Sequence, residues 1–445
     1  TGTNTFVGLV SVNSNGSWTT SVAGNSYTLN GGLTFDGLTF TPNTSIFNFT
    51  INDQSIGGAN AFTLYRVVCG TAGKTITNNT TNAVTGLTIS NLISGVGNFT
   101  NAGLLNLTVT GNPFTITGTL DFATNPNTVN YSGAGIAQTI AGVAPSTTLN
   151  FYNLTISGAR AATNVTLWNG GTIGISNALT LSATFTTGNY VTASNTVNYN
   201  GTVAQNIPAL VSTISVAYNN LTISGGSTKT LTNNISVGGI LNLNSGILEL
   251  SNYNLTITNN AAGAITGAFD ATHMISTGGT GYLVKNAASA QVLNPIGSGG
   301  FYSPMTLTSI APNTGTYSIK AIPTGLNPIY INKYWDLITS LGGKTITATF
   351  QYDPAELNGA SNTIVYLPNP PGTTVQCPPT TGVSTFGANT FTITGNSGFT
   401  SGYWSMGGNA TYYSYMTGDW NTASTWTSDP SGTLQIGSTI PGYND

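Results

Sequence analysis

The sequence predicts an all-β protein in which a parallel β-helix (β-solenoid) is followed by an antiparallel β-sandwich. Three observations predict this fold class: a sequence unit that recurs at a fixed spacing, short segments that alternate apolar and polar residues, and the absence of helical periodicity. Alternation of apolar and polar residues is typical of strands, and a fixed period is typical of repeat architectures. The chain is therefore expected to build its cores from many short strands.

The clearest repeat pairs an Asn-Thr-Val-Asn-Tyr segment with an Asn-Leu-Thr-Ile-Ser-Gly segment some two dozen positions later. The pair occupies residues 127–131 and 153–158, and it recurs at residues 195–199 and 220–225. The second segment thus shifts by 67 positions, from 153 to 220. An antiparallel sandwich could also use such strands, but one third of this period is about 22 residues, which fits one coil of a β-helix. We therefore expect three coils in each repeat.

The composition agrees with a stacked architecture. Only 4% of the 445 residues are charged, whereas 39% are hydrophobic. Disordered chains combine low hydrophobicity with high charge, so this chain is expected to fold. In a β-helix, Leu, Ile and Val stack on their own kind inside, while Asn and Thr at corners and outer faces hydrogen-bond along the axis, where charged side chains would stack like on like.

Changes in the pattern of residues divide the chain into four expected segments. Residues 1–80 match no pattern and are expected to form an N-terminal cap or assembly segment, followed by the parallel β-helix over residues 81–270. Longer strands that are richer in aromatic residues predict a β-sandwich over residues 271–408. Residues 409–445 are expected to form a C-terminal tail, which is a possible donor segment for the next subunit.

The order of several motifs resembles a known family. After the Gly- and Thr-rich region, the motifs are residues 273–285, 294–308, 333–337 and 402–408. Together they resemble the modular secreted surface proteins of Gram-negative gliding bacteria, which are adhesin-like or type IX secretion cargo-like. In that family a sandwich follows the β-helix, so the resemblance implies the same order here. No recognisable C-terminal sorting domain follows, and residues 1–80 match nothing in the family.

Charge and hydropathy limit the partners that we expect. A net charge of −3, with eight basic residues scattered over the chain, offers no electrostatic surface for nucleic acid or for an anionic membrane. No apolar run reaches the roughly 20 residues of a membrane-spanning helix, so membrane insertion is not expected. An uncharged surface of Thr, Asn and Ser predicts an extracellular or cell-surface location. Cys69 and Cys377 are the only cysteines, and whether they pair is left open.

The sequence argues against an enzyme. Acid and base chemistry on polysaccharides needs paired carboxylates, and among the acids only Asp353 and Glu356 are close in sequence. Because Pro354 follows Asp353, we expect Asp353 to begin a turn, with Glu356 in a solvated loop. His273 is the only histidine, and no acid is placed in sequence to orient it, so it is expected to be a polar residue at the junction before the sandwich. No catalytic residue, metal site or cofactor is predicted.

Apolar segments near both ends are the candidate assembly interface. An apolar, β-prone run at a free terminus, if exposed, can pair with a strand of another chain. The tail resembles the start of a new β-helix module, which cannot bury its own apolar face. The tail folds back on its own sandwich, belongs to a module that continues in a longer protein, or completes the next subunit by strand addition. Strand addition gives a filament when the contact does not close. The candidate residues are Phe6, Val7, Leu9, Val10, Trp420, Trp426, Leu434 and Ile436.

Three functions follow in order of preference. The first is a noncatalytic structural subunit of an extracellular filament or surface fibre, whose partners are other copies of itself. The alternative is a carbohydrate-binding cell-surface adhesin module that binds surface glycans, and the third is a polysaccharide-active β-helix enzyme. Trp335 and Trp404 could stack on sugars if exposed, but we expect them in the sandwich core.

Overall fold

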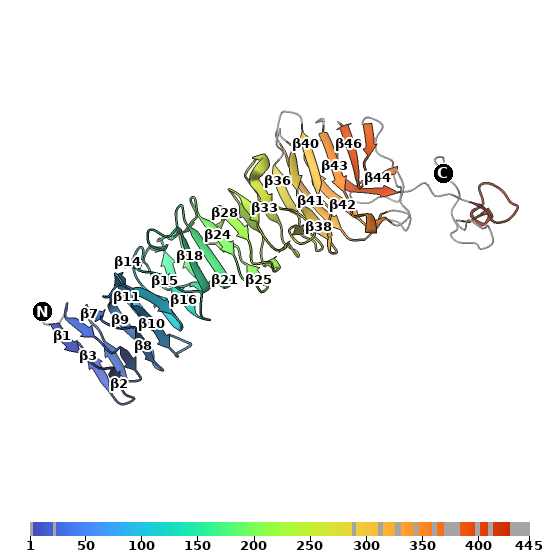
Figure 1. Cartoon of the computed structure of the whole chain (residues 1–445). Helices are drawn as coiled ribbons and strands as arrows, with labels where there is room; N and C mark the ends of the chain where they lie inside the picture. Colours follow the sequence, from blue (N-terminus) through green and yellow to red (C-terminus); the bar gives the residue numbers. More distant parts are fainter. Residues whose placement is uncertain are drawn as a thin grey trace. The chain divides into compact units, whose positions relative to one another are not determined.

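A computed structural model describes most of the chain (Figure 1). The described residues are 3–20, 24–286, 291–309, 315–324, 331–341, 346–357, 363–368, 383–396, 401–407 and 413–427. The chain divides into two compact units, which comprise Thr1–Asn259 with Ala264–His273, and Asn260–Gly263 with Met274–Asp445. In the described ranges the chain is all-β apart from 3₁₀ turns at η1 (Ala262–Ala264), η2 (Pro354–Glu356) and η3 (Ala423–Thr425).

The first unit is a parallel β-solenoid of about 12 turns. Successive coils place their strands side by side in one long parallel sheet, in which β14 (Phe114–Ile116) pairs with β11 beside the main path. The strands of that path, in spatial order, are β1 (Thr3–Phe6), β4 (Ser26–Leu29), β7 (Ile46–Phe49), β9 (Phe62–Cys69), β11 (Leu87–Gly95), β13 (Leu104–Leu107), β16 (Thr128–Tyr131), β18 (Thr148–Ile156), β21 (Thr172–Leu181), β24 (Thr196–Tyr199), β28 (Asn220–Ile223), β31 (Leu241–Leu243) and β34 (Ile265–Gly267).

Shorter sheets form the other sides of the coils. A six-stranded parallel sheet contains, in spatial order, β15 (Leu120–Asp121), β12 (Asn98–Asn101), β10 (Thr75–Thr80), β8 (Gln54–Gly58), β5 (Leu33–Phe35) and β2 (Val10–Val12). The remaining parallel sets are β3 (Ser17–Thr19) with β6 (Thr39–Thr41); β17 (Gln138–Ile140), β20 (Val165–Leu167) and β23 (Tyr190–Val191); β19 (Ala159–Ala161) with β22 (Thr184–Phe185); β25 (Gln205–Ile207), β29 (Lys229–Leu231) and β32 (Leu248–Glu249); and β30 (Ile235–Val237) with β33 (Leu255–Ile257). One antiparallel pair, β26 (Leu210–Val211) with β27 (Ser215–Val216), interrupts the pattern.

The strand order agrees with three coils per sequence repeat. β16 and its repeat β24 are separated in the long sheet by β18 and β21 alone. Neighbouring coils are offset by 25 positions where Thr128 lies beside Asn153, and by 24 positions where Thr172 lies beside Thr196. Three offsets of this size add up to more than the period of 67 positions. The difference arises because successive pairings use different parts of the long strands β18 and β21. β16 pairs with the second half of β18, whereas β24 pairs with the first half of β21.

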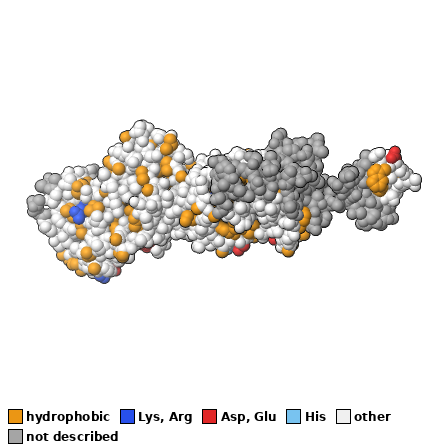
Figure 2. Space-filling model, turned by 90° about the horizontal axis from the view of Figure 1, so that it is seen from above, with side chains coloured by type: hydrophobic (Ala, Val, Ile, Leu, Met, Phe, Trp, Pro, Cys, Tyr) orange, Lys and Arg blue, Asp and Glu red, His pale blue; other side chains and the backbone are white. Residues whose placement is uncertain are grey.

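Apolar and polar ladders run along opposite faces of the long sheet. One inward ladder consists of the buried residues Ile173, Val197, Leu221, Leu241 and Ile265. Each such side chain removed from water contributes roughly 1.5–3 kcal/mol before entropic costs. An outward ladder consists of Thr148, Thr172, Thr196 and Asn220. The expected separation of aliphatic interior from Asn- and Thr-rich exterior is therefore present, and few charged side chains are visible on the face in Figure 2.

Residues 1–80 do not form a separate cap, because the described part of this segment consists of coils of the same solenoid. β1, β4, β7, β9 and β11 follow one another in the long sheet without a break. Aromatic side chains fill these coils in place of the aliphatic ladder of the repeat. Trp18 packs edge-on against Tyr27 at 5.4 Å between ring centroids, and Tyr27 stacks on Phe47 at 5.6 Å. We expected a boundary at residue 80 because the aromatic side chains inside these coils do not recur in the sequence at the period of the later repeat.

The second unit is built mainly from antiparallel strands. One sheet contains β36 (Leu283–Asn286), β41 (Thr316–Ile322), β42 (Tyr334–Thr339), β47 (Gly402–Gly407) and β44 (Thr363–Pro368), in that order. Another contains β37 (Val292–Asn294), β40 (Met305–Ser309), β43 (Ile346–Gln351), β46 (Thr390–Asn396) and β45 (Val383–Phe386). Shorter pairings join β38 (Ile296–Ser298) to β35 (Ile275–Ser276) and β39 (Phe301–Tyr302), and β48 (Tyr413–Ser414) to β49 (Trp426–Thr427).

Aromatic side chains of the two larger antiparallel sheets meet in one core. Trp335 on β42 lies 5.2 Å from Phe350 on β43 and 5.6 Å from Phe391 on β46, measured between ring centroids. Trp404 on β47 is stacked on Phe350 at 6.2 Å. Trp335 and Trp404 are both fully buried, which confirms the prediction that they are core residues.

Candidate functional site

In the first coil that the structure describes, the strands are paired on one side only. β1, β2 and β3 are each the last strand of their sheet, paired on one side with β4, β5 and β6 respectively. No strand within the described ranges pairs with their other side. A row of unpaired backbone N–H and C=O groups is a template on which another chain can add a strand.

Two of the predicted interface residues lie in the first described coil and point toward the solenoid core. Phe6 and Val10 occupy inward positions, because their neighbours in the next coil, Leu29 and Leu33, are fully buried. Phe6 is nevertheless 37% exposed, since no coil covers it within the described residues. Among the described aromatic side chains it contacts only the ring of Trp18, at 6.1 Å between centroids.

Val7 and Leu9 lie at the corner between β1 and β2. They are 80% and 58% exposed, so they add apolar surface next to the open end. The structure therefore brings together all four of the interface residues predicted near the N-terminus. We name the surface formed by Phe6, Val7, Leu9 and Val10, with the free strand edges, the first-coil surface.

The predicted tail residues are only partly described. Trp420 and Trp426 pack edge-to-face, with ring centroids 4.4 Å apart, and the indole N–H of Trp426 donates to the carbonyl oxygen of Trp420 at 2.9 Å. Trp420 remains 60% exposed. Leu434 and Ile436 lie outside the described residues.

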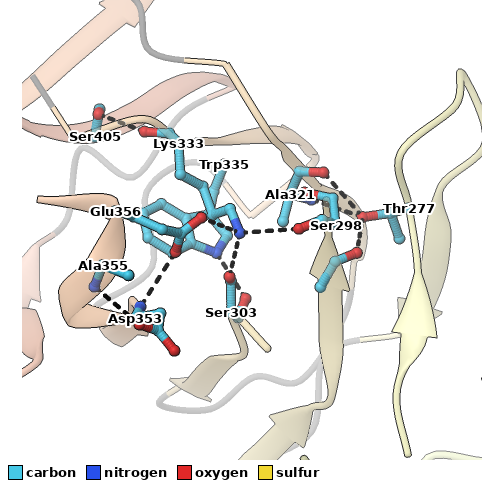
Figure 3. Close-up of polar contacts among 11 residues, drawn as sticks. Thr277, Ser298, Ser303, Ala321, Lys333, Trp335, Asp353, Ala355, Glu356 and Ser405 are labelled. Atoms are coloured by element: carbon cyan, nitrogen blue, oxygen red, sulfur yellow. Dashed lines mark hydrogen bonds and ion pairs between the residues drawn. The ribbon is translucent and has the colours of Figure 1, made fainter. Parts of the chain in front are cut away.

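The acidic pair singled out in the sequence is a structural element (Figure 3). Asp353 begins a turn as predicted, because its carboxylate caps η2 by accepting from the backbone N–H of Ala355 at 2.9 Å. The prediction of a solvated Glu356 is wrong, since this side chain is 2% exposed and lies 2.6 Å from the ammonium of Lys333. Its other carboxylate oxygen accepts from the backbone N–H of Asp353 at 3.1 Å. Both oxygens of Glu356 are thus engaged.

The ammonium group of Lys333 has three acceptors. Besides Glu356, its ammonium donates to the hydroxyl of Ser303 at 2.6 Å and to the carbonyl of Ser298 at 3.3 Å. Burial lowers the pKa of Lys333, and the hydrogen bond to Glu356 opposes this. Trp335 donates its indole N–H to the carbonyl of Ser303 at 2.9 Å, so Ser303 links the ion pair to the aromatic core (Figure 3). This arrangement indicates a structural ion pair, because each N–H of the ammonium has a partner.

His273 does have an acid beside it, contrary to the expectation from the sequence. Its Nδ1 lies 2.9 Å from a carboxylate oxygen of Asp270, three residues earlier. Hydrogen bonds from Thr272 lower the pKa of the exposed Asp270 to about 2. The expectation failed because it sought a distant orienting acid and overlooked a turn in which Asp270 and His273 also pair through their backbones.

Two buried glutamines, at the first positions of β17 and β25, were not predicted from the sequence. Gln138 donates to the carbonyls of Leu107 and Val109 at 2.8 and 2.9 Å. Gln205, which is 67 positions later, donates to the carbonyls of Ile175 and Asn177 at 2.9 and 3.0 Å. Extending the repeat alignment to polar positions could have found them.

Cys69 has no disulfide partner among the described residues, and Cys377 lies outside them. Burial raises the pKa of the Cys69 thiol to about 12, so this thiol is protonated at neutral pH. In the described part of the chain, no three His, Cys, Asp or Glu side chains come close enough to hold a metal ion. No helix in that part has the length and apolar character to cross a membrane.

Asp336 on β42 is a buried carboxylate whose pKa is raised. It is 3% exposed, it accepts from the hydroxyl of Tyr282 at 2.6 Å, and the ammonium of Lys320 lies 3.8 Å away. Its other oxygen is buried without a hydrogen-bond partner among the described residues. Burial raises the pKa of Asp336, while the hydrogen bond from Tyr282 and the charge of Lys320 lower it less strongly.

The Asp336→Asn variant is expected to be more stable than the wild type at pH 7. Because the folded-state pKa lies above the unfolded one, the folded chain binds more protons, and stability falls as pH rises through the folded pKa. The variant lacks this loss, so its melting temperature should exceed that of the wild type at pH 7 and approach it toward pH 4. Melting curves over this pH range check the prediction. A difference that does not change with pH would contradict it.

Comparisons with protein-family models, with curated proteins and with solved structures find no match to this chain. The class that the fold defines is an all-β protein with a parallel β-solenoid.

Proposed function

We propose that the protein is a noncatalytic structural subunit of an extracellular filament or surface fibre, in which copies join end to end at the first-coil surface. The observation that carries this proposal is that, among the described residues, β1, β2 and β3 lack a strand partner on one side and the inward residue Phe6 is partly exposed. A strand added there would satisfy the open backbone groups and cover Phe6 and Val10.

The proposed donor favours a filament over a closed dimer. If the tail of one copy pairs with the first coil of another, the contact joins two different surfaces of the protein. Such head-to-tail contacts produce open filaments when the rotation between copies does not close a ring. Covering Phe6, Val7 and Leu9 would contribute up to roughly 1.5–3 kcal/mol each, before the cost of association.

The remaining parts of the proposal have separate support. The shared aromatic core of Trp335, Trp404, Phe350 and Phe391 supports a β-sandwich for the two larger antiparallel sheets. The donor of the added strand is proposed to be the tail, residues 409–445, of the neighbouring copy. The low charge of 4% and the motif order support secretion to the cell surface as in the adhesin-like family. The engagement of Asp353 and Glu356 in a cap and an ion pair favours a structural over an enzymatic role.

The proposal is tested by placing charge on the first-coil surface. The double variant Phe6→Asp with Val10→Asp should remain monomeric under conditions in which the wild type forms filaments, because carboxylates cannot be buried at the junction. Deletion of residues 410–445 should have the same effect if the tail is the donor. Negative-stain electron microscopy and sedimentation velocity measure the outcome.

Val203→Asp is the matched control for this test. Val203 is 57% exposed on a middle coil of the solenoid, so a charge there should leave filaments intact. Wild-type protein that stays dispersed at every concentration would overturn the proposal. Equal assembly of the double variant and the wild type would exclude the first-coil surface as the junction.

A further inference from the structure

A notch interrupts the corner between the long sheet and the six-stranded sheet. The corner between β12 and β13 consists of residues 102–103 only, whereas the corners of the coils on either side comprise residues 81–86 and 122–127. The short corner leaves a cavity of about 630 Å³ between its longer neighbours. Gly103 keeps this corner close to the coil, because a Cβ there would clash with the carbonyl oxygen of Thr80.

A buried ladder of hydrogen-bonded side-chain amides lies beneath the notch and fixes its shape. The side chain of Asn78 donates to that of Asn101 at 2.7 Å, and Asn101 donates to Asn127 at 3.0 Å. Asn127 then donates to the carbonyl of Phe122 at 2.9 Å, which fixes the longer corner on one side. The cavity is therefore preformed, and its volume falls within the roughly 300–1,000 Å³ that small-molecule sites occupy.

The lining of the notch is uncharged and mixed in polarity. The exposed side-chain amide of Asn79 forms no hydrogen bond within the described residues, and the hydroxyl of Thr128 accepts from Asn153 at 3.4 Å and retains its own proton to donate. Apolar contact surface comes from Ala102, Leu104 and Pro126. No Asp, Glu, Lys or Arg lines the cavity in the described part of the chain.

We propose that this notch binds a neutral polysaccharide, through a short stretch of sugar rings. Sugar rings present hydroxyl groups beside apolar C–H faces, which matches free amide and hydroxyl groups set among small apolar side chains. An acidic glycan would find no cation to offset its desolvation. A peptide strand could not add here, because β12 and β13 are each paired on both sides. This site goes beyond the proposed role in a filament and would let the assembled fibre adhere to a surface.

The test measures binding of the full chain to neutral linear hexasaccharides, such as cellohexaose, maltohexaose and laminarihexaose, and to hexagalacturonate. Isothermal titration calorimetry and a glycan array should show binding to at least one neutral glycan and at least tenfold weaker binding to hexagalacturonate. Ala102→Trp, which fills the notch, should weaken that binding at least tenfold. Asn79→Ala should weaken it several-fold without disturbing the buried ladder.

Ala162→Trp is the matched control, because Ala162 is exposed on the solenoid and does not line the notch. It should bind as the wild type does, and circular dichroism should show that each variant is folded. Binding to no neutral glycan, equal binding to hexagalacturonate, or wild-type binding by both notch variants would overturn the proposal. The Phe6→Asp, Val10→Asp variant should retain glycan binding, so that failure of the filament proposal and failure of this one can be distinguished.

Discussion

Glu356→Ala is expected to destabilise the second unit by about 3–5 kcal/mol, because it leaves the buried ammonium of Lys333 without its counter-charge. The side chains of Lys333 and Glu356 are 0% and 2% exposed, so water cannot replace the lost carboxylate without opening the core. The substitution also removes the acceptor for the backbone N–H of Asp353. Urea unfolding of the full chain, followed by tryptophan fluorescence, measures the change, since Trp335 is hydrogen-bonded beside the ion pair.

The double variant Lys333→Met with Glu356→Met provides the control for this effect. Replacing both members of a buried ion pair by apolar residues of similar size is often neutral or stabilising. The double variant should therefore recover most of the stability lost by Glu356→Ala. If the single variant is as stable as the wild type, the ion pair is not buried as described.

Asn101→Leu is expected to destabilise the solenoid by about 2–6 kcal/mol, because buried polar groups left without partners cost roughly 1–3 kcal/mol each. Asn101 is 1% exposed, accepts from Asn78 and donates to Asn127. Leucine offers neither a donor nor an acceptor, so both neighbouring amides lose a partner. Thermal and urea unfolding of the full chain, with amide hydrogen exchange at β10, β12 and β16, measures the loss.

The matched control is Asn106→Leu on the outer face of the long sheet. Asn106 is partly exposed and accepts from Asn130 at 2.9 Å. Water can replace that hydrogen bond, so the expected cost is about 0.5–1.5 kcal/mol. Equal costs for the two variants would show that the buried ladder contributes no more than the outer one.

The fold could be predicted wherever its physical cause is local in sequence. The segment at residues 127–131 contains a strand whose inward Val129 and Tyr131 recur as Val197 and Tyr199, so the coil period was visible. The first coils were not recognised because Trp18 fills the interior with a ring that contacts rings from several coils at once. Such packing has no fixed sequence period.

The candidate site could be predicted only in part, for a related reason. The exposed apolar run containing Phe6 was visible in the sequence, but which of its side chains point into the core depends on pairing with the next coil, at Leu29. The burial of Glu356 could not be predicted, because its partner Lys333 is 23 positions earlier and meets it only through the tertiary fold. The notch depends on the relative lengths of three corners, which sequence patterns alone did not define.

Amide hydrogen exchange as a function of protein concentration tests the central claim most directly. If copies join at the first-coil surface, the amides of β1, β2 and β3 should become protected as concentration rises, while those of middle strands such as β21 and β24 should not change. Protection of the first coil that is independent of concentration, from dilute protein to the highest concentration that stays in solution, would contradict the account.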